Sequence, residues 1–207
     1  MHEAAINAFV TMFVVIDPVS LAPLFVALTG GMSREQRLRV GLTALAVSAC
    51  VLGLFALAGD ALLGGIGISM PAFRIAGGLL LFLTALDMLF ERRTARRERS
   101  SAAPDSDDDP SVFPLAIPLI AGPGAIASVI LLMGRHEGDL GGQAMVLGVT
   151  LAVLAIVLLA FLLASPLERL LRRVGVMVVT RLLGMLLAAL SVQFVLDGIA
   201  DVDLLAR

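Results

Sequence analysis

The sequence predicts an all-α membrane protein of six transmembrane helices, arranged as two inverted three-helix repeats with broken first and fourth helices. Composition, the lengths of the apolar segments and an internal repeat lead to this prediction. Of the 207 residues, 59 % are hydrophobic and 15 % are charged, and the mean hydropathy is +1.00. Soluble domains are only about 45–50 % apolar, so the chain is too apolar to be a water-soluble domain.

Six apolar segments are each close to the roughly 20 residues that a helix needs to cross a bilayer. The second begins after Ser33, which with Gln36 resembles a capping box. The segments are expected at about residues 4–28, 34–58, 70–90, 112–133, 143–164 and 174–196.

One long hydrophilic segment, residues 91–111, separates the third and fourth apolar segments. It contains five arginines followed by an acidic stretch with proline and serine, a composition typical of a solvated loop. The predicted division is therefore a first three-helix repeat at 1–90, a cytoplasmic loop at 91–111 and a second repeat at 112–207.

All fifteen cationic residues are arginines, and their placement orients the spans. Eleven lie in the three connections that face the cytoplasm when the N-terminus is outside, and only Arg135 and Arg207 lie in outer segments. By the positive-inside rule both termini face away from the cytoplasm. The rival topology has re-entrant first and fourth segments and places ten arginines inside and three outside, so the preference for full spans is small. Arginine-only usage with abundant Ala, Leu and Gly is typical of GC-rich bacteria, so we expect the chain to lie in a bacterial inner membrane. The side away from the cytoplasm is then the periplasm, where both termini are expected.

An internal repeat supports two halves of opposite orientation. An offset of 107 residues matches 41–43 with 148–150 and 74–77 with 181–184, and an offset of 105 places 17–18 on 122–123. Two halves of three spans each must insert in opposite orientations, which is the plan of many secondary transporters. Chance similarity between Leu- and Ala-rich helices is the alternative, although Arg and Pro are rare in such helices and still match.

The first break is Asp17-Pro18, within the apolar run FVVIDPVSLAPLFVAL. A proline is best tolerated at the first position of a helix, so a new half-helix is expected to start at Pro18, with Ser20 in its first turn. Asp17 is then either an N-cap or an ionisable group within the membrane that binds substrate or a coupling proton. The two roles are compatible.

The second break is Gly122-Pro123-Gly124, preceded by Pro114 and Pro118. Three prolines within ten residues exclude a regular helix there. The free N–H groups at a helix start attract an anionic group, and because this break lacks an acid, the N–H groups of Gly124 and Ala125 are the better candidates for holding a carboxylate. A kink that serves packing alone is the alternative.

Arg74 and Arg181 occupy equivalent repeat positions inside their spans. A guanidinium at such a depth costs about 2.5–3.5 kcal/mol on insertion scales unless it finds a partner. They are predicted to bind a substrate carboxylate or to pair with an acid as gates, or else to extend to the headgroups. Thr43, Thr84, Thr150, Ser191 and Gln193 could line a polar path or bond their own helix backbone.

The chain resembles the MarC family of bacterial inner-membrane proteins. The resemblance rests on residues 16–19 with 23–25, on PLIAGPGAI at 118–126, and on RIAGG at 74–78. It implies six spans with both termini periplasmic, in agreement with the arginine count, and the family includes members described as neutral amino-acid transporters. After Asp-Pro-x this chain has Ser20-Leu21, where the family pattern has a small Gly and often a polar residue.

The sequence therefore predicts a secondary transporter or exporter of small neutral amino acids or related metabolites, driven by a proton or sodium gradient. No enzyme motif or metal-ligand set is present, so we expect no catalysis, no cofactor and no nucleic-acid partner. The alternatives are an ion or solute channel and a non-transporting protein that assembles through small residues, and a homodimer is compatible with the sequence. The candidate substrate-binding residues are Asp17, Pro18, Ser20, Arg74, Gly122, Pro123, Gly124, Ala125 and Arg181.

Overall fold

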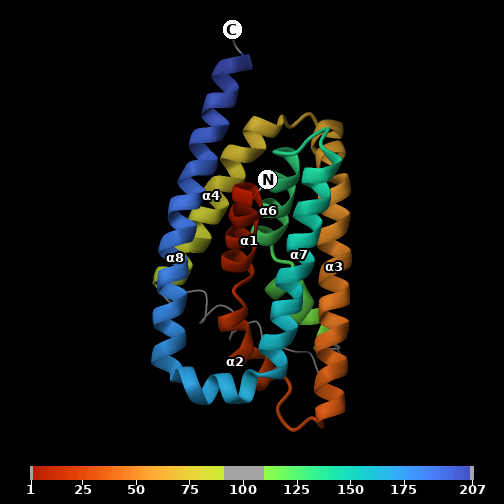
Figure 1. Cartoon of the computed structure of the whole chain (residues 1–207), viewed down its shortest axis with the longest axis vertical. Helices are drawn as coiled ribbons and strands as arrows, with labels where there is room; N and C mark the ends of the chain where they lie inside the picture. The colour runs from red at the N-terminus through yellow and green to blue at the C-terminus, as the bar shows by residue number, and fades with distance from the viewer. Residues whose placement is uncertain (1, 91–109, 206–207) are drawn as a thin grey trace.

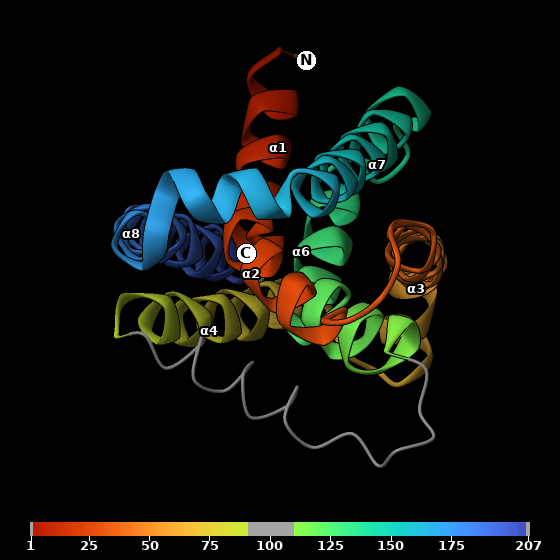
Figure 2. The same ribbon diagram turned by 90° about the horizontal axis from the view of Figure 1, so that it is seen from below.

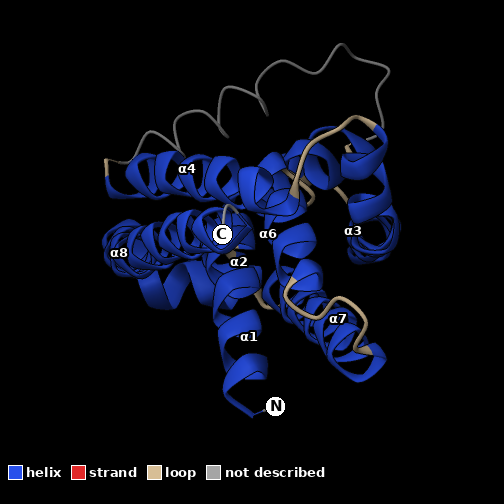
Figure 3. Cartoon of the chain, turned by 90° about the horizontal axis from the view of Figure 1, so that it is seen from above, coloured by secondary structure: helices blue, strands red, loops and turns tan. Residues whose placement is uncertain are grey.

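A computed structural model describes residues 2–90 and 110–205, and every element within these two ranges is a helix (Figure 3). Residues 91–109 of the predicted cytoplasmic loop lie outside the described residues. The element η1 is a π-helix and the others are α-helices. The elements are α1 (His2–Ile16), α2 (Pro18–Leu28), α3 (Arg34–Gly65), α4 (Met70–Leu89), η1 (Ser111–Ile120), α6 (Pro123–Gly134), α7 (Leu140–Leu162) and α8 (Ala164–Leu205).

Five helical stretches of the described chain are long and apolar enough to cross a membrane, and the count is six when η1 and α6 are taken as one bent span. The first stretch, His2–Leu28, contains both α1 and α2. The prediction of an all-helical membrane protein is confirmed, and helix interruptions are present in both the first and the fourth segment.

One predicted boundary is wrong. The second helix was expected to end near residue 58, but α3 continues to Gly65. Gly59 does not end this helix because it lies where α3 packs against α6, and a Cβ there would be only 2.7 Å from Ile130 Cγ1. The chain turns at Gly67, whose φ of +77° suits glycine. The sixth candidate span starts at Val174, as predicted. The connection before it is helical as well, since α8 begins at Ala164 and its first part crosses the lower end of the bundle (Figure 1).

Successive segments run in alternating directions in Figure 1. The pair α1 and α2 descends, α3 ascends and α4 descends, whereas η1 with α6 ascends, α7 descends and α8 ascends. Each segment of the first half therefore runs opposite to its counterpart in the second half. The start of α1 and the end of α8 lie toward the upper end of the bundle in this view.

The two interrupted segments form the centre of the molecule. Seen along the bundle, α2 and α6 lie in the middle with α3, α4, α7 and α8 around them (Figure 2). In the most apolar part of His2–Leu28, 67 % of the residues are buried, compared with 33 % in α3, α4 and α7. The outer helices instead expose large apolar side chains, as expected of a surface that faces lipid. More than half of the residue surface is exposed at Leu54, Leu57, Leu83, Leu151, Leu159 and Leu186.

Helices α4 and α8 run antiparallel to each other. They pack closely because glycines lie at their contact. A Cβ at Gly78 would be 2.7 Å from Val195 Cγ2 and 2.8 Å from the carbonyl oxygen of Ser191. At Gly198 of α8 a Cβ would be 3.0 Å from the carbonyl oxygen of Pro71. Small residues allow such close approach of helix backbones within a membrane, so this contact depends on the absence of side chains at these positions.

We expect Gly78→Ala to lower the free energy of unfolding by about 1–3 kcal/mol, because the added methyl group overlaps a backbone oxygen that cannot rotate away. Gly53→Ala is the matched control, since nothing lies within 4 Å of a Cβ at that position, and alanine should stabilise α3 slightly. Unfolding of the purified protein in detergent measures both. Equal stability of the two variants would contradict the close contact between α4 and α8.

Candidate functional site

The first break is a single residue, Asp17, between α1 and α2. Asp17 is fully buried and has left-handed backbone angles, φ 59° and ψ 68°, which Asp tolerates better than most residues. Its Oδ1 accepts a hydrogen bond from the Ser20 N–H at 3.3 Å. Pro18 occupies the first turn of α2. The predicted N-cap and proline placement are confirmed.

The second break is more strongly bent, and η1 and α6 meet at 54°. Within η1, Phe113 and Ile117 have extended backbone angles, each preceding a proline. Such a residue is driven away from helical angles by the proline ring. Gly122 is the N-cap of α6, Pro123 follows it, and no side chain caps this helix start among the described residues. As predicted, the two half-helices differ, since α2 is capped by the acid Asp17 and α6 has no capping side chain in the described part of the chain.

The two breaks lie side by side at the centre of the bundle. A Cβ at Gly124, in the first turn of α6, would be 3.3 Å from Val15 Cγ1 near the end of α1. The same position is 3.7 Å from the Thr84 hydroxyl of α4. Both breaks also lie near mid-height in Figure 1. Gly122, Pro123, Gly124 and Ala125 are thus brought next to the segment that contains Asp17.

A hydroxyl pair links the first break to α8. The Ser20 Oγ and the Thr180 Oγ1 are 2.8 Å apart, and both residues are buried. Ser20 was predicted as a site residue, whereas Thr180 was not. Nothing in the local sequence indicates this contact, because the two residues are 160 positions apart.

Ser128 of α6 is a further polar residue that sequence reasoning missed. It is fully buried, and its hydroxyl has no hydrogen-bond partner among the described residues. Because it follows Gly124 by four residues, it lies on the same face of α6. This i, i+4 relation to the second break is the signal by which the sequence could have indicated it.

Arg74 and Arg181 do not join the breaks. The Arg74 side chain is 11 % exposed and forms an ion pair with Asp201 of α8. Arg181 is exposed on α8, directly after the inward-facing Thr180. The twenty residues between Arg181 and Asp201 correspond to about 30 Å of helix, so the two arginines lie toward opposite ends of the bundle.

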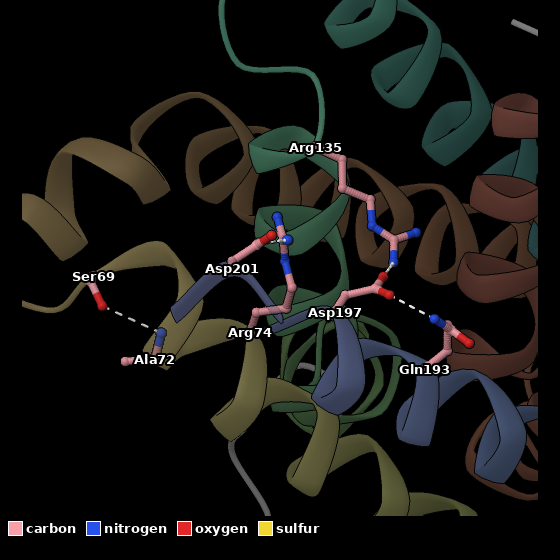
Figure 4. A network of polar contacts seen from close by, with 7 residues as sticks. All are labelled: Ser69, Ala72, Arg74, Arg135, Gln193, Asp197 and Asp201. Atoms are coloured by element: carbon pink, nitrogen blue, oxygen red, sulfur yellow. Dashed lines mark hydrogen bonds and ion pairs between the residues drawn. The ribbon is translucent and has the colours of Figure 1, made fainter. Parts of the chain in front are cut away.

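Polar residues at the upper end of the bundle connect α4, α6 and α8 (Figure 4). Besides the Arg74–Asp201 pair, Arg135 at the end of α6 forms an ion pair with Asp197 and lies 4.6 Å over the Phe194 ring. The Gln193 Nε2 donates to Asp197 Oδ1 at 2.6 Å. Sequence reasoning missed both aspartates, although the spacing of 193, 197 and 201 places them on one face of α8.

Three of the other proposed polar residues bond their own helices. Thr84, Thr150 and Ser191 each donate a hydroxyl hydrogen to a carbonyl oxygen of the preceding turn, at 3.0, 2.9 and 2.7 Å. At the lower end, the rings of Phe25 and Phe161 stack with centroids 4.2 Å apart. The breaks therefore lie between an ion-pair cluster at one end and an aromatic pair at the other.

Substitutions at Asp17 test its backbone conformation. Alanine and glycine both remove the carboxylate, but only alanine is strained in the left-handed region, so we expect Asp17→Ala to be less stable than Asp17→Gly by about 1–2 kcal/mol. In an ordinary helix interior the order is reversed by about 1 kcal/mol. Unfolding in detergent distinguishes the two cases, and a more stable alanine variant would mean that residue 17 is helical.

A double-mutant cycle tests the Arg74–Asp201 pair. We expect Asp201→Asn to destabilise the protein because it leaves a nearly buried guanidinium without its carboxylate, and the coupling energy with Arg74→Gln should be roughly 1–2 kcal/mol. The control cycle combines Arg39→Gln with Asp60→Asn, two exposed residues toward opposite ends of α3. The control cycle should be additive. Additive changes in the free energy of unfolding in the Arg74–Asp201 cycle as well would exclude this ion pair.

Comparisons with known proteins agree with this architecture. The chain matches the family described as "MarC family integral membrane protein" over residues 2–202. It is 37 % identical to a UPF0056 membrane protein of Archaeoglobus fulgidus over 94 % of this chain and 91 % of the relative. The UPF0056 membrane protein YhcE of Escherichia coli strain K12 is 34 % identical, covering 94 % and 91 %.

A third relative, the UPF0056 inner membrane protein MarC of Citrobacter koseri, is 32 % identical over 93 % of this chain and 92 % of its own length. No solved structure matches. The family match extends over nearly all the described helices, including both breaks and the glycines between α4 and α8. The chain is therefore a member of the MarC family of integral membrane proteins.

Proposed function

We propose that this protein is a secondary transporter or exporter of small neutral amino acids or related metabolites across the bacterial inner membrane. The observation that supports this most directly is the contact between two interrupted helices at the centre of the bundle. A break in backbone hydrogen bonding at membrane depth is tolerated where it is buried in protein or lines a cavity. Transporters use such breaks to bind solutes near the midplane.

The proposed architecture is two inverted three-helix repeats. Three features support it: the repeated sequence positions, the opposite directions of corresponding segments in Figure 1 and the antiparallel contact of α4 with α8, the third helix of each half. In this arrangement the two repeats rock against each other and expose the central site to each side in turn.

The uncapped start of α6 is the proposed site for a substrate carboxylate. The N–H groups of Gly124 and Ala125 and the partial positive charge of the helix start favour an anionic group. Ser128 and the Ser20–Thr180 pair supply hydroxyls for a polar solute. Asp17 is proposed to receive the substrate amino group or a coupling proton, while Arg74 and Arg181 act as outer and inner gates.

The proposed orientation places the lower end of Figure 1 in the cytoplasm. That end carries Arg34, Arg37 and Arg39 at the start of α3, whereas the acids Asp197 and Asp201 lie at the upper end. Positive charge accumulates on the cytoplasmic side of membrane proteins. Both termini then face the periplasm.

The packing bears on one alternative. A protein that assembles through small residues needs glycines on a free face. Gly77, Gly78 and Gly184 contact other helices of the same chain, whereas a Cβ at Gly53 would meet nothing within 4 Å, so only Gly53 of these four is available for such assembly. A homodimer through other surfaces is compatible with this packing. A channel is the other alternative, and the transport kinetics distinguish it from a carrier.

Uptake by purified protein in liposomes tests the proposed function. We expect saturable counterflow of at least one small neutral amino acid from a labelled panel, and competition by that amino acid but not by its amide, which lacks the carboxylate. Pro123→Ala should reduce uptake, whereas Gly148→Ala should not, since nothing lies within 4 Å of a Cβ there. No uptake of any panel member would exclude the amino-acid assignment, and flux without saturation or counterflow would favour a channel.

The role of Asp17 in coupling is tested separately. In liposomes with an imposed pH gradient, we expect Asp17→Asn to lose the stimulation of uptake by the gradient but to retain counterflow, because asparagine keeps a capping oxygen and cannot ionise. Stimulation equal to that of the parent protein would exclude Asp17 as the proton site. Stimulation by a sodium gradient alone would assign the coupling to sodium.

A further inference from the structure

A pocket of about 380 Å³ lies at the arginine-rich end of the bundle, between the end of α2, the start of α3 and the end of α7. Among the side chains that the structure describes, its lining contains two cations, Arg34 and Arg37, and no acidic residue. The rest of its wall is mainly apolar and includes Phe25, Leu158 and Leu162. The pocket thus combines a positive edge with an apolar interior.

Neither arginine is neutralised within the described part of the chain. Arg34 and Arg37 form no ion pair there, and the buried Nε of Arg37 has no hydrogen-bond partner. Both also lie in the first turn of α3, where the helix dipole disfavours cations. A bound anion would relieve this repulsion and supply acceptors for the guanidinium N–H groups.

The position of the pocket indicates an amphiphilic anion. Its walls belong to the ends of two candidate spans, because α3 starts at Arg34 and α7 ends at Leu162. It is therefore at the level where the hydrocarbon meets the headgroups. Leu38 and Leu162, which are 41 % and 51 % exposed, flank it with apolar surface.

We propose that this pocket binds an acidic phospholipid, with the phosphate on Arg34 and Arg37 and an acyl chain along Leu38 and Leu162. The guanidinium fork matches phosphate oxygens in pairs. The apolar walls distinguish this site from one for a free inorganic anion, which gains nothing from leucine side chains. The proposal does not depend on the transport activity, since it concerns a site at the edge of the bundle rather than the central breaks.

Thermal unfolding of the full chain in detergent, with added lipid, tests this site. Dioleoyl phosphatidylglycerol should raise the unfolding temperature, whereas dioleoyl phosphatidylcholine and inorganic phosphate should raise it much less. In the double variant Arg34→Gln with Arg37→Gln, the phosphatidylglycerol concentration for half of the maximal shift should increase roughly tenfold or more, as expected when charge-assisted hydrogen bonds are lost.

Arg39→Gln is the control, and it is compared with Arg34→Gln and Arg37→Gln taken singly as well as together. It removes one arginine charge from the same helix end, and Arg39 does not line the pocket. Its half-maximal concentration should change less than about twofold, since an exposed charge contributes little. An equal increase of the half-maximal concentration in the Arg39 variant would mean that the lipid is attracted by the positive charge of this helix end in general, and would contradict the pocket. An equal rise of the unfolding temperature with inorganic phosphate would assign the pocket to a free anion. Native mass spectrometry of the parent protein adds an independent measurement, and failure to retain phosphatidylglycerol over phosphatidylcholine would overturn the proposal.

Discussion

The structure depends on one constraint, which is that backbone N–H and C=O groups need partners wherever water is excluded. The Asp17 and Gly122 breaks interrupt helical hydrogen bonding in the most apolar parts of the chain. Their neighbours must therefore shield them from lipid, and this requirement explains why α2 and α6 are central (Figure 2). At the first break the Asp17 carboxylate satisfies the Ser20 N–H, whereas at the second the start of α6 has no capping side chain.

Close helix packing makes this central arrangement feasible. The glycines of α4 and α8 let these two helices approach until side chains of one touch the backbone of the other. Gly59 does the same for α3 against Ile130 of α6, and Gly124 brings α6 against Val15 of α1. In lipid, where burial of apolar surface gives little driving force between helices, such contacts contribute much of the stability. These glycines therefore set how closely the helices pack around the two breaks.

Charge is separated along the bundle. Arginines at the start of α3 lie at one end without acidic partners in the described part of the chain, whereas Arg74 and Arg135 at the other end are paired with Asp201 and Asp197. Paired charges hold helices together, and unpaired charges remain available to headgroups and ions. One end is accordingly suited to an ion-pair gate and the other to contact with an anionic leaflet, and the proposed transport site lies between them.

The sequence by itself determined the features that arise within a few residues. The apolar segments, the capping of α3 by Ser33, the cap at Asp17 and the irregular course of η1 all follow from side chains acting on their own or adjacent turns. The family was also recognisable from local motifs. These predictions were correct because proline and capping groups change the backbone wherever they occur.

Tertiary structure decided which residues meet. Arg74 is bonded to Asp201, 127 residues away, and Ser20 contacts Thr180 across 160 residues. No local pattern specifies such partners, because they depend on helix rotation and on the height at which two helices cross. The continuation of α3 through Gly59 has the same origin, since contact with Ile130 outweighs the weak helix propensity of glycine. The sequence therefore determined where the helices break, and packing determined what surrounds each break.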